Sequence, residues 1–176
     1  MKAVLALSVA ILLLVTAFAS TKINSFAYAI SADPILGIQI ASDGTVVGTD
    51  IISRIGETYT LLSNLSESIT VMRNNVTIDG KGHSIIGHGN STGVYLRDVN
   101  HVTVRNLIVG NFDVGIDLSC MDLGSRNNTI EKNTLNGDGT GIALGLNAMY
   151  NSVDGNTVEN GNNGIYIGMS NHNILR

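Results

Sequence analysis

Short stretches that alternate apolar and polar residues recur from residue 75 to the end of the 176-residue chain. The first pattern occurs at Asn75-Val76-Thr77-Ile78, His101-Val102-Thr103-Val104, Asn128-Thr129-Ile130, Asn151-Ser152-Val153 and Asn173-Ile174-Leu175. The second occurs at Gly93-Val94-Tyr95-Leu96, Gly115-Ile116-Asp117-Leu118, Gly141-Ile142-Ala143-Leu144 and Gly164-Ile165-Tyr166-Ile167. A third apolar position recurs at Val109, Leu135 and Val158. Because each stretch is bounded by Asn, Gly or Asp, each repeat is predicted to hold three short strands.

The repeat length is 22 to 26 residues, since Ile78, Val104, Ile130, Val153 and Leu175 follow one another at intervals of 26, 26, 23 and 22. A three-strand unit of this length cannot bury its own apolar face, so successive units must stack. The pattern therefore predicts an all-β solenoid, a single-stranded parallel β-helix with equivalent positions about 4.8 Å apart from one coil to the next. The abundant Asn, 20 residues in all, is expected to form turns and hydrogen-bonded stacks along the axis.

Alternation along each strand predicts which side chains point outward. Apolar residues such as Ile116 and Leu118 are expected inside the coil. One outward column should contain Tyr95, Asp117, Ala143 and Tyr166, and a second Asp79, Arg105, Glu131 and Asp154.

The first 29 residues have the composition of a targeting segment. Met1-Lys2 precedes 19 uncharged residues, and small residues follow at 17, 19, 27 and 29. This arrangement is typical of a secretory signal peptide, with cleavage expected after Ala29 or, as a second choice, after Ala19. An uncleaved anchor is the alternative, because 19 residues reach roughly 28 Å as a helix. Residues 30–57 are then expected to form a capping segment and 58–176 the coils, outside the cytoplasm.

The repeat Asn-Asn-Thr-Ile-x-x-Asn-x-Leu, starting at Asn127 and followed by Gly141-Ile142-Ala143-Leu144, resembles those of the periplasmic copper-binding NosD-like family and related carbohydrate-associated β-helix proteins. Residues 58–82 look like the first coil of secreted, especially archaeal, members. The resemblance covers about residues 36–176 and implies a right-handed coil. It leaves the activity open, because such proteins include copper-pathway accessories, surface proteins and polysaccharide-degrading enzymes.

The resemblance makes copper a ligand to consider. The soft or borderline donors are His83, His88, His101, His172, Cys120, Met121, Met149 and Met169. The histidines share no repeated register, so Cys120 and Met121 in the long loop 119–126 are the metal candidates. We predict no cofactor, with copper or calcium as alternatives.

The second outward column could carry catalysis. Paired carboxylates such as Glu131 and Asp154 are what glycoside hydrolysis requires, and Arg105 beside them would suit a lyase acting on uronates. The competing interpretation is an ion-pair ladder in which Arg105 lies between Asp79 and Glu131.

Glycan binding is the other chemistry that the outward columns suggest. Tyr95, Asp117 and Tyr166 could form a shallow sugar-stacking face, because aromatic rings offer a flat apolar surface with a polar tip. Four sequons, at Asn64, Asn75, Asn90 and Asn127, are candidates for glycosylation.

The net charge of −4 becomes −6 without Lys2 and Lys22, and no Lys/Arg cluster is present, which argues against a nucleic-acid partner. We expect a secreted or cell-surface, non-catalytic module that binds a polysaccharide, a surface glycan or another surface protein, with membrane contact only through an uncleaved N-terminal segment. A polysaccharide lyase or glycoside hydrolase is the first alternative and a copper-pathway accessory the second. The strand begun at 173–176 without a cap suggests a fragment of a longer protein.

Overall fold

The computed structural model of the protein describes residues 37–120 and 122–176. Every regular element in these residues is a β-strand. The described part of the chain contains no helix long and apolar enough to cross a bilayer. The predicted signal peptide and the first residues of the predicted cap lie outside the described residues.

The strands are short, between two and five residues, as the sequence pattern predicts. Their bounds are β1 Ile38–Ile40, β2 Val46–Val47, β3 Ile52–Ile55, β4 Thr58–Leu61, β5 Ile69–Val71, β6 Thr77–Asp79, β7 Ser84–Ile86, β8 Thr92–Leu96, β9 Thr103–Arg105, β10 Ile108–Gly110, β11 Val114–Asp117, β12 Thr129–Glu131, β13 Thr134–Asn136, β14 Thr140–Leu144, β15 Ser152–Asp154, β16 Thr157–Glu159, β17 Asn163–Ile167 and β18 Ile174–Leu175.

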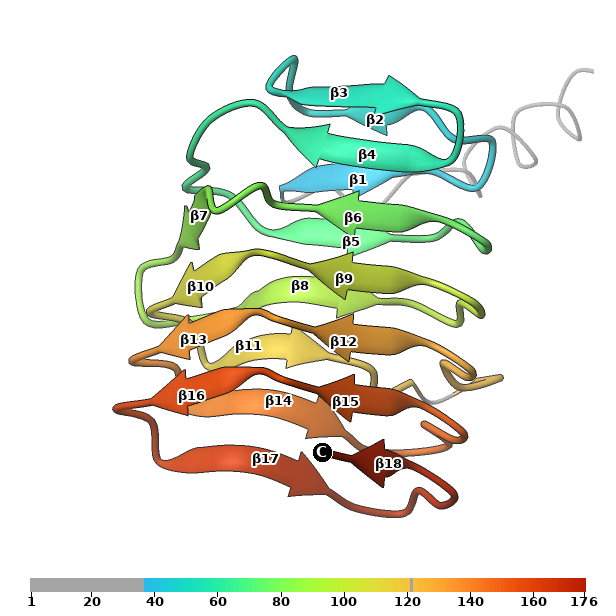
Figure 1. The fold of residues 1–176 in the computed structure, drawn as a ribbon, viewed down its shortest axis with the longest axis vertical. Coiled ribbons are helices and arrows are strands. Elements are labelled where there is room, and N and C mark those ends of the chain that lie inside the picture. The colour runs from blue at the N-terminus through green and yellow to red at the C-terminus, as the bar shows by residue number, and fades with distance from the viewer. Residues whose placement is uncertain (1–36, 121) are drawn as a thin grey trace, which may run out of the picture. The chain divides into compact units, whose positions relative to one another are not determined.

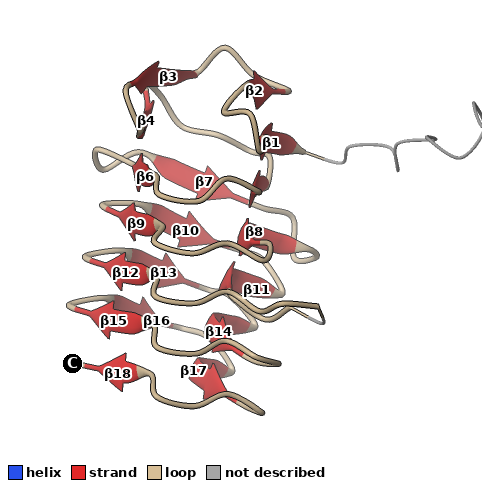
Figure 2. Cartoon of the chain, turned by 90° about the vertical axis from the view of Figure 1, so that its right-hand side faces the viewer, coloured by secondary structure: helices blue, strands red, loops and turns tan. Residues whose placement is uncertain are grey.

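Three sheets run along the solenoid, which makes about four turns (Figures 1 and 2). Sheet A has the order β17-β14-β11-β8-β5-β1-β2, sheet B β18-β15-β12-β9-β6-β4-β3, and sheet C β16-β13-β10-β7. Each full coil contributes one strand to each sheet, and strands of successive coils pair in parallel. The predicted all-β solenoid of three-strand coils is therefore confirmed.

Aliphatic side chains stacked inside the coils form the core. Ile116, Leu118, Ile130 and Ile142 have no solvent exposure, so the predicted inward positions are confirmed. The inward positions of β17 are more exposed, Ile165 at 37% and Ile167 at 48%, because no described coil covers them.

The glycine that opens each sheet A repeat stands where the coils approach closely. A Cβ at Gly93 would lie 2.7 Å from the carbonyl oxygen of Gly115, and a Cβ at Gly115 would lie 2.7 Å from that of Gly141. Any larger residue would therefore have to push adjacent coils apart. A Cβ at Gly164, by contrast, would meet nothing within 4 Å.

Stacked asparagines hold the turn between sheets B and C. The side-chain oxygen of Asn133 accepts a hydrogen bond from the Leu107 amide at 3.0 Å, and its Nδ2 donates to the Val104 carbonyl at 3.0 Å. Asn156 repeats this on the next coil with the Asn133 amide and the Ile130 carbonyl. The predicted Asn stack is present, and its main partners are backbone groups of the preceding coil.

Asn128, Asn151 and Asn173 form the equivalent ladder between sheets A and B. Their side-chain oxygens accept from the amides of Val102, Asn128 and Asn151, respectively. These bonds satisfy backbone groups that the turns would otherwise leave buried without partners.

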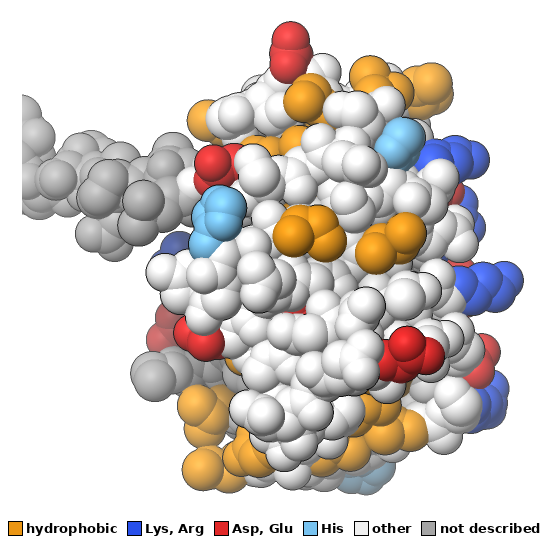
Figure 3. All heavy atoms as spheres, turned by 90° about the vertical axis from the view of Figure 1, so that its left-hand side faces the viewer, with side chains coloured by type: hydrophobic (Ala, Val, Ile, Leu, Met, Phe, Trp, Pro, Cys, Tyr) orange, Lys and Arg blue, Asp and Glu red, His pale blue; other side chains and the backbone are white. Residues whose placement is uncertain are grey.

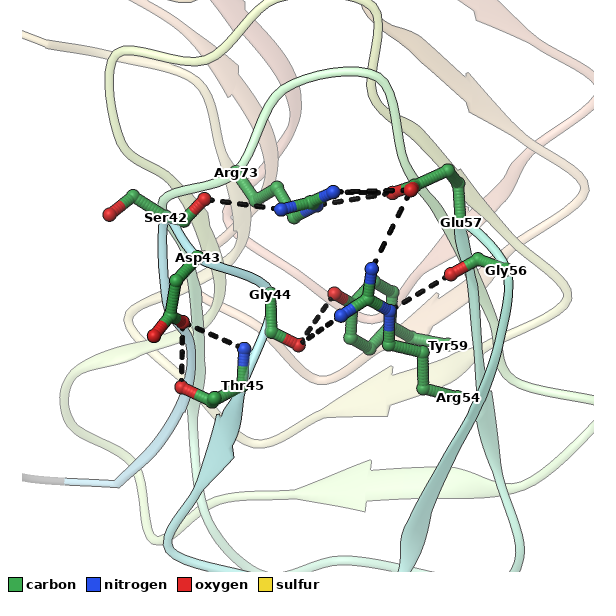
Figure 4. A network of polar contacts seen from close by, with 9 residues as sticks. All are labelled: Ser42, Asp43, Gly44, Thr45, Arg54, Gly56, Glu57, Tyr59 and Arg73. Carbon is green, nitrogen blue, oxygen red and sulfur yellow. Dashed lines mark hydrogen bonds and ion pairs between the residues drawn. The ribbon is translucent and has the colours of Figure 1, made fainter.

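Antiparallel strands lie at one edge of sheets A and B, where β2 pairs with β1 and β3 with β4. Figure 4 shows the polar network there. Arg73 donates two hydrogen bonds of 3.1 Å to the Glu57 carboxylate, while Arg54 and the Tyr59 hydroxyl both donate to the Gly44 carbonyl. The network connects the turn after β1 to the β3–β4 hairpin, and we assign it a role in holding the fold together.

Candidate functional site

The outward column of sheet B has the predicted composition. Backbone pairing places Asp79 beside Arg105, Arg105 beside Glu131, and Glu131 beside Asp154. Arg105 donates to Asp79 Oδ2 through Nε at 3.1 Å and lies 3.1 Å from it through a terminal nitrogen. Within the described residues, no ion pair joins Arg105 to Glu131, so only half of the ladder forms.

Asp79 is buried and serves the fold. Its Oδ1 accepts from the Lys81 amide at 3.0 Å and from Asn106 Nδ2 at 3.1 Å. Burial raises the pKa of Asp79, but the hydrogen bonds from Asn106 and Lys81 and the charges of Arg105 and Lys81 outweigh it, so the pKa lies below its ordinary value. Asp79 therefore stays ionised as the anchor of a turn.

Glu131 and Asp154 lie on neighbouring strands of one sheet face, about one strand spacing apart along the axis. Neither they nor Arg105 line either of the two surface grooves described below, one at the turn between sheets B and C and one at the other side of sheet C. The geometry thus places two carboxylates side by side on a strand face, without an enclosing wall to orient a sugar between them. Catalysis by Glu131, Asp154 and Arg105 remains a hypothesis.

The outward column of sheet A contains Tyr95, Asp117, Ala143 and Tyr166 in the predicted order. Tyr166 is 51% exposed, whereas Tyr95 is partly buried and its hydroxyl donates to Cys120 Sγ at 3.7 Å. Asp117 accepts from the Ser119 amide at 2.7 Å. The two rings are three coils apart, about 14 Å along the axis, so they act as separate contact points if sugars stack there.

Cys120 is 5% exposed and lies between Tyr95 and Asp98. Burial and the hydrogen bond with Cys120 raise the pKa of Tyr95. Burial also raises the pKa of Asp98, but hydrogen bonds from the Cys120 thiol and the amides of Gly124 and Leu123 lower it below its usual range. These contacts fix the start of the long loop. Met121, the other metal candidate, lies outside the described residues.

The described residues show no ready-made metal centre of His, Cys, Asp or Glu side chains. They contain no group of three such side chains that could hold an ion, and Asp98 is the carboxylate that contacts the candidate Cys120. The expectation that no two histidines share a register is wrong for His101 and His172, which occupy equivalent turns. The two turns are three coils apart, too far for one metal ion to bridge, and His172 stacks on Tyr150 with ring centroids 4.8 Å apart. Copper and calcium sites therefore remain untested expectations.

A shallow groove of about 500 Å³ lies at the turn between sheets B and C. Its lining residues are Lys81, Gly82, Asn106, Leu107, Ile108, Lys132 and Thr134. The sequence analysis missed this site because Lys81 and Lys132 are far apart in sequence. One signal was present in the sequence: Lys132 follows Glu131 as Asn106 follows Arg105, so the two residues share a register. The turn that contains Lys81 lies one coil from Asn106 and two coils from Lys132.

A second groove, of about 340 Å³, lies at the other side of sheet C and is lined by residues that include Glu67, His88, Ser91 and Phe112. It contains one histidine and one carboxylate, both exposed. The four sequon asparagines, Asn64, Asn75, Asn90 and Asn127, are also exposed, so glycosylation there remains a prediction.

Comparison with known proteins settles the family. The family model described as periplasmic copper-binding protein (NosD) matches residues 29–176, which covers all the coils. The chain belongs to the NosD family. Searches of curated proteins and of solved structures gave no significant match. Membership confirms the resemblance carried by the Asn and Gly repeats, while the copper-binding description applies to the NosD family as a whole.

Proposed function

We propose that this NosD-family chain is an extracytoplasmic, non-catalytic module that binds glycans on the outer surface of its coils. The observation that carries the proposal is the alignment of outward positions along the axis, one per coil, as in the column of Tyr95, Asp117, Ala143 and Tyr166. Equivalent positions repeat about every 4.8 Å, which is close to the length of one pyranose unit. A rigid coil can therefore meet successive sugars of an extended polysaccharide with equivalent positions.

Three features support an extracytoplasmic location. The matched family is described as periplasmic, and residues 1–29 have the composition of a secretory signal. The lone Cys120 is buried, so a thiol exposed to an oxidising compartment is avoided.

The non-catalytic part of the proposal rests on the carboxylates. Asp79 is buried in an ion pair with Arg105, which removes Asp79 from general acid or base work. Glu131 and Asp154 remain, on a strand face rather than across a cleft. Glycoside hydrolysis requires a carboxyl group on each side of the scissile bond. Two carboxylates side by side on one flat face are poorly placed to flank a bond in this way.

Retention on immobilised polysaccharides tests the binding proposal. The full chain is passed over neutral and acidic polysaccharides, with the urea-unfolded chain as control. We expect the folded chain to be retained on at least one of them and the unfolded chain on none. Passage of the folded chain through every column would refute glycan binding.

Copper handling is the second candidate because of the family description. An anaerobic Cu(I) titration with metal analysis tests it, with Cys120→Ser as the variant. One equivalent of copper bound by the chain and lost in Cys120→Ser would replace glycan binding as the leading function. On the glycan-binding account, the wild-type chain and Cys120→Ser retain equal, substoichiometric copper.

A further inference from the structure

The groove at the turn between sheets B and C combines positive charge with apolar surface. Lys81 lies in the turn after β6 and Lys132 in the turn after β12, with Asn106 on the coil between them. The apolar lining is Ile108, which is 40% exposed, together with the buried Leu107, and Thr134 adds a hydroxyl on the next strand of sheet C. Figure 3 shows hydrophobic side chains on the face of sheet C and Lys and Arg side chains along one edge.

The groove has a net positive charge although the chain is acidic overall. The carboxylate beside Lys81 is Asp79, which is buried and already compensated by Arg105 at 3.1 Å, whereas Lys81 Nζ lies at 3.8 Å. Lys132 has no carboxylate within 4.0 Å among the residues that the structure describes. Its positive charge is therefore available to a ligand.

We propose that this groove binds an acidic polysaccharide of the polyuronate class through Lys81 and Lys132. The strands that precede the two lysines are two coils apart, about 10 Å along the axis. In a polyuronate whose consecutive sugars face opposite ways, every second carboxylate points to the same side, two sugar lengths from the previous one. The lysines match that repeat, and Asn106, Ile108 and Thr134 face the sugar between them.

This inference rests on the proposed function and names its ligand class. It differs from the predicted Tyr95, Asp117 and Tyr166 face in both position and chemistry, since charge rather than ring stacking selects the ligand. Exposed charge pairs are weak individually and screened by salt, so binding should depend on both lysines and weaken as the ionic strength rises.

Calorimetric titration of the full chain with a size-defined oligogalacturonate tests the site, with a malto-oligosaccharide of equal length as the neutral probe. The variants are Lys81→Asn, Lys132→Asn and the double variant. Lys81 and Lys132 have φ values of 52° and 55°, a region that Asn tolerates well, so these changes remove charge without straining the turns. Arg97→Asn, at an exposed cation beyond β8, is the matched control.

We expect the double variant to bind oligogalacturonate about five- to tenfold more weakly, each single variant to show part of that loss, and Arg97→Asn to match the wild type. Equal binding by the double variant and the wild type would overturn the site and leave glycan binding intact. Binding of the neutral probe alone would also overturn only the site. Binding of neither probe, with retention on no polysaccharide column, would refute both proposals.

Discussion

Asp138, at the turn between sheets C and A, plays the part that Asn128 and Asn133 play at the other two turns of the coil. Its Oδ1 accepts from the Phe112 amide at 2.9 Å, as Asn133 accepts from Leu107. Asn133 also donates through Nδ2 to the carbonyl of Val104, 29 residues earlier, and Val109 stands at the same interval before Asp138. Asp138 is 2% exposed, and its Oδ2 is buried without a hydrogen-bond partner among the described residues. The change Asp138→Asn should restore the missing donor.

The expected gain follows from the unpaired atom. A buried polar group without a partner costs about 1–3 kcal/mol, so Asp138→Asn should raise the free energy of unfolding by about that amount at pH 7. Burial raises the pKa of Asp138 above 3.8, although the Phe112 amide lowers it. The folded state therefore binds the proton more tightly, and stability falls as the pH rises from about 3.8 through the folded pKa. Below that window both states are protonated, and the gain should shrink.

Urea unfolding of the wild type and Asp138→Asn at pH 7 and pH 3.5 measures both quantities. Asp113→Asn, at an exposed carboxylate one coil away, is the control and should change the free energy of unfolding by less than about 0.5 kcal/mol. Destabilisation by Asp138→Asn at pH 7, or a gain of equal size at both pH values, would refute the reasoning.

Three further predictions concern the free energy of unfolding, measured in urea. Asp79→Asn should cost about 1–3 kcal/mol at pH 7. Because the folded pKa of Asp79 is lowered, the contribution of its charge to stability is present above pH 3.8 and is lost as the pH falls through the folded pKa. An undiminished cost of the substitution in acid would contradict this role. Asn133→Ala should cost about 2–4 kcal/mol because the Leu107 amide and the Val104 carbonyl lose their partner. Asn136→Ala, at an exposed position, should cost far less, and similar costs for the two variants would refute the asparagine ladder. Gly93→Ala should cost about 1–3 kcal/mol by overpacking against the next coil, whereas Gly164→Ala, with open space at its Cβ, should cost little; the reverse order would rule out this packing.

The repeat made the fold predictable from sequence. Alternation determines which side chains point inward, and the recurrence of the same short motifs determines which residues pair, so both outward columns were predicted residue by residue. The pairing of Asp117 with Tyr95 and of Glu131 with Arg105 confirms this. The glycine at the start of each sheet A repeat was visible as a pattern, and the structure supplies its steric reason.

Side-chain choices and loop paths were not predictable in the same way. Periodicity placed Arg105 between the carboxylates of Asp79 and Glu131. That Arg105 pairs with Asp79 rather than with Glu131 depends on how deeply the Asp79 carboxylate is buried. The contact of Cys120 with Tyr95 depends on the path of a loop that breaks the repeat, and the Lys81–Lys132 groove includes a turn longer than its equivalents. Such features arise where the chain departs from its own period.

Product release from a polysaccharide that the full chain retains tests the central claim, binding without cleavage, most directly. The reaction is followed by reducing ends and by the absorbance of unsaturated uronates, with Glu131→Gln and Asp154→Asn in parallel. The account predicts no product above the protein-free control and equal retention of all three proteins. Release of reducing or unsaturated ends by the wild type, abolished in either variant, would contradict it.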